Sequence, residues 1–113
     1  MTELPKEKAE EVYTLIEVAN ATGKIKKGIN EVAKAVERGH AKIVAIAADA
    51  NPAEIVMHIP TLGKEKGIPV LKVPSKEELG AAAGLQVSTV AVAVVEAGDG
   101  KATLEQLTTE FKA

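Results

Sequence analysis

Three short segments rich in Val, Ile, Leu and Ala most strongly limit what this chain can fold into. They cover residues 43–48, 68–73 and 90–95. Runs of this length and composition are typical of β-strands that are covered on both faces. Strands of this kind need helices above and below the sheet to bury them. The pattern therefore favours an α/β protein.

The segments between these strands have helical patterns. Apolar residues recur at helical spacing, and Gly and Pro residues mark the ends. We predict helices over residues 5–21, 29–38, 52–59, 75–83 and 103–111. Pro60 is expected to break or kink the third helix, with a further turn or two reaching Lys66. Ser75 and Glu78 have the spacing of a capping box at the start of the fourth helix.

Strands that are separated by helices imply parallel crossover connections. Residues 24–27 form a short extended link, with a possible fourth strand near Ile25. We therefore predict an α/β fold, a three-layer α/β/α sandwich around a small mixed four-stranded sheet. A length of 113 residues corresponds to a single domain, residues 1–113.

The composition excludes several functional classes. The chain has no cysteine, which excludes disulfides, zinc knuckles and cysteine nucleophiles. Tyr13 and Phe111 are its two aromatic residues, so RNA modules that stack bases on aromatic side chains are poor candidates. No apolar run approaches the roughly 18 residues of a membrane helix, and residues 1–11 lack the apolar stretch of a signal peptide. We expect a soluble, cytoplasmic protein that acts as a monomer and makes no contact with membranes.

Charge is unevenly distributed along the chain, although the formal net charge is only −2. Residues 1–21 contain five glutamates and two lysines, a formal charge of −3. Residues 24–42 contain six basic and two acidic side chains, a formal charge of +4. A local basic patch can attract phosphate whatever the total charge of the chain. From charge alone, this segment is either a phosphate-binding surface or an ordinary solvated face.

No group of residues has the pattern of a catalytic or metal site. His40 and His58 have no partners at metal-ligand spacing. Asp49 and Glu54 are more typical of a turn and a helix start than of paired catalytic carboxylates. There is no nucleophile elbow and no glycine-rich phosphate loop. We expect no catalytic residue, metal or cofactor, and the chain is not predicted to be an enzyme.

Residues 24–31 are suited to hold RNA. Basic residues lead to Gly28, and a helix begins near Asn30 and Glu31, with Lys34 one turn later on the same face. Helix-start amides and lysines can hold phosphate, while Asn and Glu side chains can pair with base edges. The alternative is ordinary helix capping by Asn30, with the Glu31 carboxylate in the first turn complementing the positive end of the helix dipole. The residues alone do not decide between these interpretations.

A second candidate is the apolar loop of Leu85, Gln86, Val87 and Ser88. Its aliphatic side chains either fold back into the core or pack against an unstacked base.

These segments together resemble a known family. The similarity covers nearly the whole chain in order, through residues 28–39 (GINEVAKAVERG), 46–52 (IAADANP), 54–60 (EIVMHIP), 73–76 (VPSK), 79–80 and 84–85. They are similar to the L-seven-Ae family of kink-turn-binding ribosomal proteins, and the overall likeness is to archaeal members. The resemblance implies an α/β/α sandwich that captures RNA in which tandem sheared G·A pairs lie beside a sharp bend.

The resemblance also implies roles for individual residues. Asn30, Glu31 and Lys34 would read the G·A pairs, next to Lys27 and Gly28. Asn51, Ile55 and Lys76 would surround an extruded base, beside the apolar loop. The predicted RNA-binding residues are Lys26, Lys27, Gly28, Ile29, Asn30, Glu31, Lys34, Arg38, Asn51, Ile55, Lys76, Leu85, Gln86, Val87 and Ser88. The implied partners are ribosomal RNA, box C/D and H/ACA guide RNA, ribonuclease P RNA and the scaffold proteins of the modification particles.

Four positions differ from the usual family pattern. Ile29 stands in place of a small residue, Ala33 in place of Thr, Asn51 in place of an acidic residue and Gly63 in place of a frequent Cys. Ile29 and Asn51 leave a second hypothesis, a protein-interaction module of the same fold with weakened RNA binding. A third, a small α/β enzyme or nucleotide binder, lacks a phosphate loop and a catalytic cluster.

Overall fold

The computed structural model describes residues 4–50 and 53–111. Over these residues the elements follow one another in the order α1 (Lys6–Thr22), β1 (Lys24–Lys27), α2 (Ile29–Glu37), β2 (Ile43–Ala47), the 3-10 helix η1 (Ala53–Ile55), α3 (His58–Lys66), β3 (Val70–Val73), α4 (Lys76–Ala82), β4 (Ala91–Glu96), the 3-10 helix η2 (Gly98–Gly100) and α5 (Lys101–Glu110). The predicted α/β fold is confirmed, and the extended link near Ile25 is a strand.

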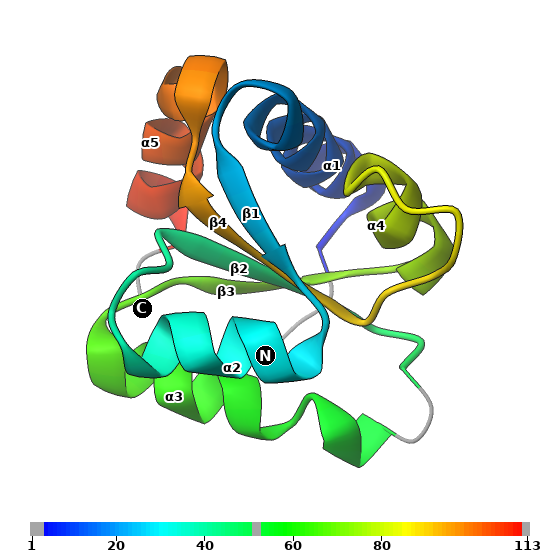
Figure 1. Ribbon diagram of the computed structural model, residues 1–113, viewed down its shortest axis with the longest axis vertical. Helices are drawn as coiled ribbons and strands as arrows, with labels where there is room; N and C mark the ends of the chain where they lie inside the picture. Colours follow the sequence, from blue (N-terminus) through cyan, green and yellow to red (C-terminus); the bar gives the residue numbers. More distant parts are fainter. Residues whose placement is uncertain (1–3, 51–52, 112–113) are drawn as a thin grey trace.

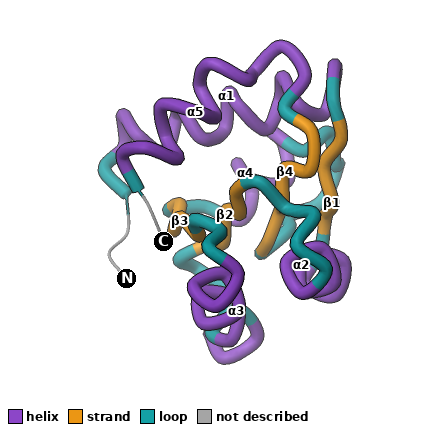
Figure 2. Tube along the Cα trace, turned by 90° about the vertical axis from the view of Figure 1, so that its left-hand side faces the viewer, coloured by secondary structure: helices purple, strands orange, loops and turns teal. Residues whose placement is uncertain are grey.

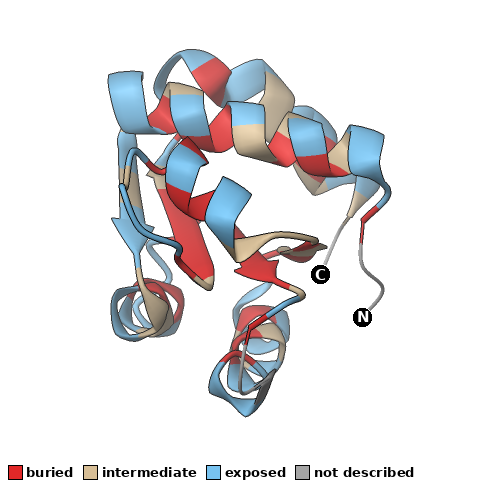
Figure 3. Ribbon diagram, turned by 90° about the vertical axis from the view of Figure 1, so that its right-hand side faces the viewer, coloured by how far each residue is buried: buried red, intermediate tan, exposed pale blue. Residues whose placement is uncertain are grey.

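Two layers of helices enclose the sheet (Figures 1 and 2). Helices α1, α4 and α5 share a core with one face of the sheet, and α2 and α3 share a second core with the other face. Strand β2 is buried along its whole length, with Ile43 and Ala45 in the first core and Val44 and Ile46 in the second. Buried residues lie mainly in the sheet and on the helix faces turned towards it (Figure 3). The predicted three-layer sandwich is therefore correct.

The sheet has the order β1-β4-β2-β3. Strand β2 is parallel to β3, while β4 lies antiparallel to both β1 and β2. Strands β1, β2 and β3 therefore all run in the same direction, as parallel crossovers predict, and β4 alone is reversed. The sheet is mixed, as expected.

The loop between α4 and β4 makes a tight contact with α4. A side chain at Gly80 would collide with the carbonyl oxygen of Val87 and the backbone of Ser88. Because Gly80 has no side chain, the loop after α4 folds back along this short helix. The chain thus returns to the edge of the sheet at which β3 ended, and β4 begins there.

The third helix differs from its prediction. We expected a helix over residues 52–59 that Pro60 would break or kink, with a further turn or two reaching Lys66. The end at Lys66 is correct, but α3 begins only at His58 and continues through Pro60. Pro60 lies in the first turn, where a backbone N–H has no partner within the helix. The missing donor therefore costs the helix nothing. Further along α3, a side chain at Gly63 would collide with Val70, so this position is closed to larger residues.

The capping box predicted for α4 is half formed. The Ser75 hydroxyl accepts a hydrogen bond from the Glu78 backbone N–H at 3.2 Å. The Ser75 N–H donates to the Tyr13 hydroxyl at 3.2 Å, the position that the Glu78 side chain would occupy in a complete box. Tyr13 on α1 therefore holds the start of α4.

Among the described residues, no helix combines the length and apolar composition needed to cross a membrane.

Candidate functional site

The carboxyl ends of β1, β2 and β3 lie together on one side of the sheet, which we call the strand-end edge. It is distinct from the two edge strands, β1 and β3. Lys27 at the end of β1 pairs with Val92, and Ala47 at the end of β2 pairs with Val73 at the end of β3. The Gly28 N–H donates to the Ala91 carbonyl at 3.0 Å, which joins the β1–α2 junction to the start of β4. The segments that follow β1, β2 and β3 therefore meet the loop that precedes β4 (Figure 1). Exposed loops at such an edge commonly carry the functional residues of a fold.

Helix α2 begins at this edge without a side-chain cap. Gly28 is its N-cap residue, with φ of 90° and ψ of 151°, and among the described residues no side chain bonds to the first amides. Asn30 and Glu31 are both exposed within the first turn. The capping interpretation of Asn30 is thus wrong. The free helix-start amides and these two side chains together offer donors and acceptors to a ligand.

Ile29 and Ala33 are half-buried and pack against the core beneath α2. The Ile29 side chain, which is larger than the residue usual at this position, is therefore partly accommodated by the protein core.

A shallow basic groove runs along α2 beside β1. It has a volume of about 80 Å³ and is lined by Lys26, Glu31, Lys34, Ala35, Arg38, His40 and Val95. Lys34 Nζ lies 3.9 Å from Glu31 Oε1, and both side chains are more than half exposed. An exposed ion pair at this distance contributes little to stability. Both side chains can therefore break this ion pair and contact a ligand instead.

His40 is a groove residue that sequence reasoning placed only at a helix end. Gly39 has φ of 71°, and the His40 N–H donates to the Ala35 carbonyl at 2.9 Å. This turn directs the chain back beside α2. The Gly39-His40 pair marked the end of the helix, but nothing in the sequence showed on which side His40 would lie.

The apolar loop lines a second cavity, beside α4. Its volume is about 370 Å³, and it is lined by Glu77, Ala81, Leu85, Gln86, Val87 and Ser88. Leu85 is half-buried and packs on the first core, whereas 69% of Val87 is exposed. The two interpretations of this loop thus apply to different residues, because Leu85 supports the core and Val87 faces outward.

Asp49 connects the end of β2 to this loop through Lys76. Its Oδ1 accepts a hydrogen bond from the Lys76 backbone N–H at 2.8 Å. The Lys76 carbonyl in turn accepts from the Thr89 N–H at 3.1 Å. We expected Asp49 to cap its own turn and the next helix in sequence, but it instead binds the first amide of α4, 27 residues away.

The structure brings together most, but not all, of the predicted residues. The strand-end edge gathers Lys27, Gly28, Asn30, Glu31, Lys76 and the loop 85–88. Ile55, in η1 after β2, is 37% exposed, while Asn51 lies outside the described residues. Arg38 is at the other end of α2, roughly 13 Å from the helix start at about 1.5 Å per residue. It belongs with Lys26 and Lys34 in the basic groove.

Within residues 4–50 and 53–111, no three His, Asp or Glu side chains are grouped in a way that could hold a metal ion.

Two comparisons with known proteins agree with this architecture. A model of the ribosomal protein L7Ae/L30e/S12e/Gadd45 family matches residues 10–104. The solved structure of the Giardia lamblia 15.5kD RNA binding protein is similar over 98% of this chain and 92% of its own, with a TM-score of 0.93 and 32% sequence identity.

Proposed function

This chain belongs to the ribosomal protein L7Ae/L30e/S12e/Gadd45 family, and from that membership we propose that it binds RNA at the strand-end edge and along the α2 groove. One observation carries the proposal. Helix α2 starts at Gly28 without a side-chain cap, and it exposes Asn30 and Glu31 between basic side chains. The similarity to a protein that is itself described as RNA binding supports this assignment.

The RNA feature that we propose is a kink-turn. Sheared G·A pairs present base edges in an open groove, where an amide and a carboxylate can pair with them. Asn30 offers both a donor and an acceptor, and Glu31 accepts hydrogen bonds from amino or ring N–H groups. Lys26, Lys27 and Lys34 offset the repulsion between phosphates that the bend brings together.

Binding of this kind selects one RNA shape. Free RNA exchanges between extended and kinked forms, and the protein binds only the kinked form. The bound population therefore shifts towards the kink by as much as the difference between the two affinities. This mechanism assigns the protein no chemical step of its own.

The loop 85–88 and η1 would flank a base that leaves the stack. Val87 and Ile55 are exposed aliphatic residues on two sides of this edge, and Lys76 lies between their segments. An unstacked base can pack against aliphatic side chains in this position, since its faces are apolar.

The proposal is tested by measuring affinity for a kink-turn duplex and for a duplex in which Watson–Crick pairs replace the G·A pairs. We expect Asn30→Ala and Glu31→Ala each to weaken kink-turn binding by about tenfold or more, since a good base contact is worth about 1–3 kcal/mol. Thermal stability should change little, because both side chains are exposed. Glu37→Ala, an exposed carboxylate in the last turn of the same helix, is the matched control.

Two results would contradict this assignment. Equal affinity for the two duplexes would show that the protein does not recognise the kink-turn. Parent-like binding by both variants would show that Asn30 and Glu31 do not form the binding site. The second hypothesis, a protein-interaction module of this fold, would then gain support. The half-buried position of Ile29 counts against it, since the side chain packs on the core.

We further propose that the cellular RNAs are ribosomal RNA, box C/D and H/ACA guide RNA and ribonuclease P RNA, with the scaffold proteins of those particles as partners. Sequencing the RNA that co-purifies with the protein would rank them.

A further inference from the structure

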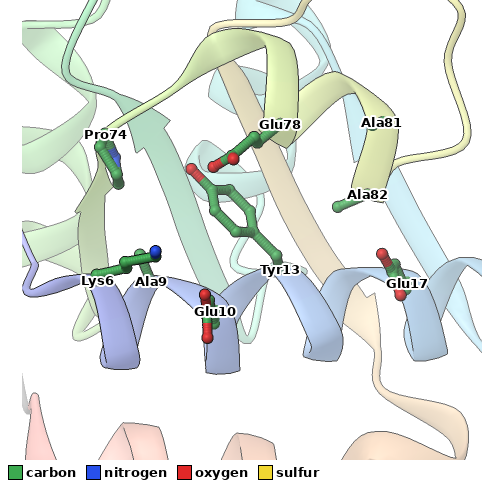
Figure 4. Close-up of a pocket in the computed structure, with 9 residues that line it drawn as sticks. All are labelled: Lys6, Ala9, Glu10, Tyr13, Glu17, Pro74, Glu78, Ala81 and Ala82. Carbon is green, nitrogen blue, oxygen red and sulfur yellow. The ribbon is translucent and has the colours of Figure 1, made fainter.

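A pocket between α1 and α4 opens on the face of the sheet opposite α2 (Figure 4). Its volume is about 230 Å³. It is lined by Lys6, Ala9, Glu10, Tyr13, Glu17, Pro74, Glu78, Ala81 and Ala82. None of these residues belongs to the proposed RNA site.

The floor of this α1–α4 pocket is apolar and held in place. Ala9 and Ala82 are buried in the first core. The Tyr13 ring extends from α1 towards Glu78 on α4 (Figure 4). Its hydroxyl accepts from the Ser75 N–H at 3.2 Å and approaches the Ser75 carbonyl at 3.4 Å. The ring is therefore fixed by backbone groups rather than free to rotate away.

The polar side chains of the pocket are mainly acidic. Glu10, Glu17 and Glu78 are all exposed, and Lys6 is the one cation among the lining residues. In the described part of the chain, the ion pairs are Lys8–Glu11, Lys8–Glu110 and Glu31–Lys34. The three pocket carboxylates are in none of these pairs, and with Lys6 as the one cation the lining residues have a formal charge of −2.

The sign of this charge separates the pocket from the α2 groove. The groove is lined by Lys26, Lys34 and Arg38, whereas the pocket would repel phosphate. A nucleic acid is therefore excluded as its occupant. The combination of an apolar floor, a fixed aromatic ring and exposed carboxylates matches a long cationic side chain.

We propose that the α1–α4 pocket binds an arginine side chain from a segment of a partner protein. The planar guanidinium can lie against the Tyr13 ring and donate to the Glu10, Glu17 or Glu78 carboxylates. Its aliphatic stem covers the alanines of the floor. The pocket and the α2 groove lie on opposite faces of the sheet, so a segment held in the pocket leaves the α2 groove open to RNA.

The test is a titration of the full chain, without RNA, with the capped peptide acetyl-Ala-Arg-Ala-Arg-Ala-amide. Its control is the same peptide with citrulline, the neutral isostere, in place of arginine. Tyr13 is the single tyrosine and the chain has no tryptophan, so intrinsic fluorescence reports directly on the pocket. Amide chemical shifts of the isotope-labelled protein locate the contact.

We expect the arginine peptide to change Tyr13 fluorescence and to shift amides of α1 and α4, and the citrulline peptide to do neither. Glu10→Gln and Glu17→Gln should each weaken binding by about two- to fivefold, as exposed ion pairs do. Lys6→Met should strengthen binding, since it removes the opposing charge. Glu105→Gln on α5, outside the pocket, should leave affinity unchanged.

Three results would overturn the proposal. They are equal binding of the two peptides, shifts confined to another surface, or parent-like affinity in both Glu10→Gln and Glu17→Gln. RNA binding by the same preparations is measured in parallel. If the parent protein binds RNA but does not bind the arginine peptide, this inference is rejected and the proposed RNA site is unaffected.

Discussion

Gly28 has a backbone conformation that side-chain-bearing residues rarely adopt, with φ of 90°. A Cβ atom at this position would meet nothing within 4 Å, so the space around it is open. The requirement for glycine is therefore conformational. At Gly63 the opposite holds, because a Cβ atom there would meet the Val70 side chain and the Ile68 carbonyl.

These two glycines give a matched pair of variants. Gly28→Ala should destabilise the protein by about 1–2 kcal/mol through backbone strain and should also weaken RNA binding, since α2 starts there. Gly63→Ala should destabilise it by about 1–3 kcal/mol through overpacking and leave the RNA affinity of the folded protein unchanged. Urea denaturation and RNA titration measure both effects. Equal RNA affinity for Gly28→Ala and the parent would separate Gly28 from the RNA site.

Tyr13 gives a prediction about alkaline pH. The pKa of its phenol is raised above the ordinary value of 10.0, first by burial and then by the nearby Glu78 carboxylate, against the Ser75 hydrogen bond. Above pH 10 the unfolded chain therefore releases this proton before the folded chain does. Tyr13 therefore contributes its full stabilisation below pH 10, and this stabilisation is lost as the pH rises through the pKa of Tyr13 in the folded state.

The comparison is with Tyr13→Phe, which leaves the Ser75 N–H without its partner and should cost about 1 kcal/mol at neutral pH. The stability advantage of the parent over this variant should shrink as pH rises above 10. Near-ultraviolet absorbance follows the ionisation of this single tyrosine directly. A difference that stays constant with pH would show that the phenol titrates alike in both states.

Sequence reasoning at the scale of single residues was correct where the neighbours are local. Ser75 was recognised as a helix cap because Glu78 follows it by three residues, and the hydrogen bond is present. Tyr13 lies 62 residues from Ser75. No local pattern encodes that contact, so its place in the cap could not be predicted.

At the scale of elements, the Asp49 carboxylate joins β2 to α4. Asp49→Ala should destabilise the protein by about 1 kcal/mol, as the loss of a helix cap does, and should weaken RNA binding by displacing Lys76 and the loop behind it. Asp49→Asn keeps the accepting oxygen and should retain most of both properties. Chemical denaturation and RNA titration are the measurements. Equal damage in both variants would point to the charge of Asp49 rather than its hydrogen bond.

The elements themselves were largely predictable, and the exceptions have physical causes. Strands β2 and β4 are continuous aliphatic runs, which local composition identifies. The position of α3 was wrong because Pro60 is compatible with a first turn as well as with a helix end. The direction of β4 is set by pairing with β1 and β2, which are more than forty residues away in sequence, so no local pattern encodes it.

At the scale of the whole molecule, charge is separated between the two faces, so RNA affinity should depend strongly on salt. The cations near the proposed site are Lys26, Lys27, Lys34, Arg38 and Lys76. Each phosphate contact adds about −0.7 to −0.9 to the slope of log affinity against log salt concentration. We expect a slope of about −3 to −5 for the parent if most of these residues contact phosphate.

Lys26→Ala should reduce the magnitude of that slope by about one. Lys64→Ala, an exposed lysine in the last turn of α3, should leave it unchanged. A slope near zero would indicate that the basic groove does not meet phosphate.

Local sequence patterns could not predict that the segments of the proposed site lie together. The start of α2 and the loop 85–88 are separated by more than fifty residues, and the Gly28–Ala91 hydrogen bond brings their segments together. The charge of residues 24–42 predicted a basic surface. Only the family resemblance predicted that this surface and the loop 85–88 belong to the same site.

Strand β1 has a further consequence for solubility. It lies at an edge of the sheet, and its Lys24, Lys26 and Lys27 side chains are exposed. At the opposite edge, the Leu4 N–H donates to the Lys72 carbonyl on β3. An open strand edge can pair with another copy of the chain, and lysines oppose this by repulsion. The lysines proposed to hold phosphate therefore also protect the protein against strand-mediated aggregation, and they are needed for that purpose whenever RNA is absent.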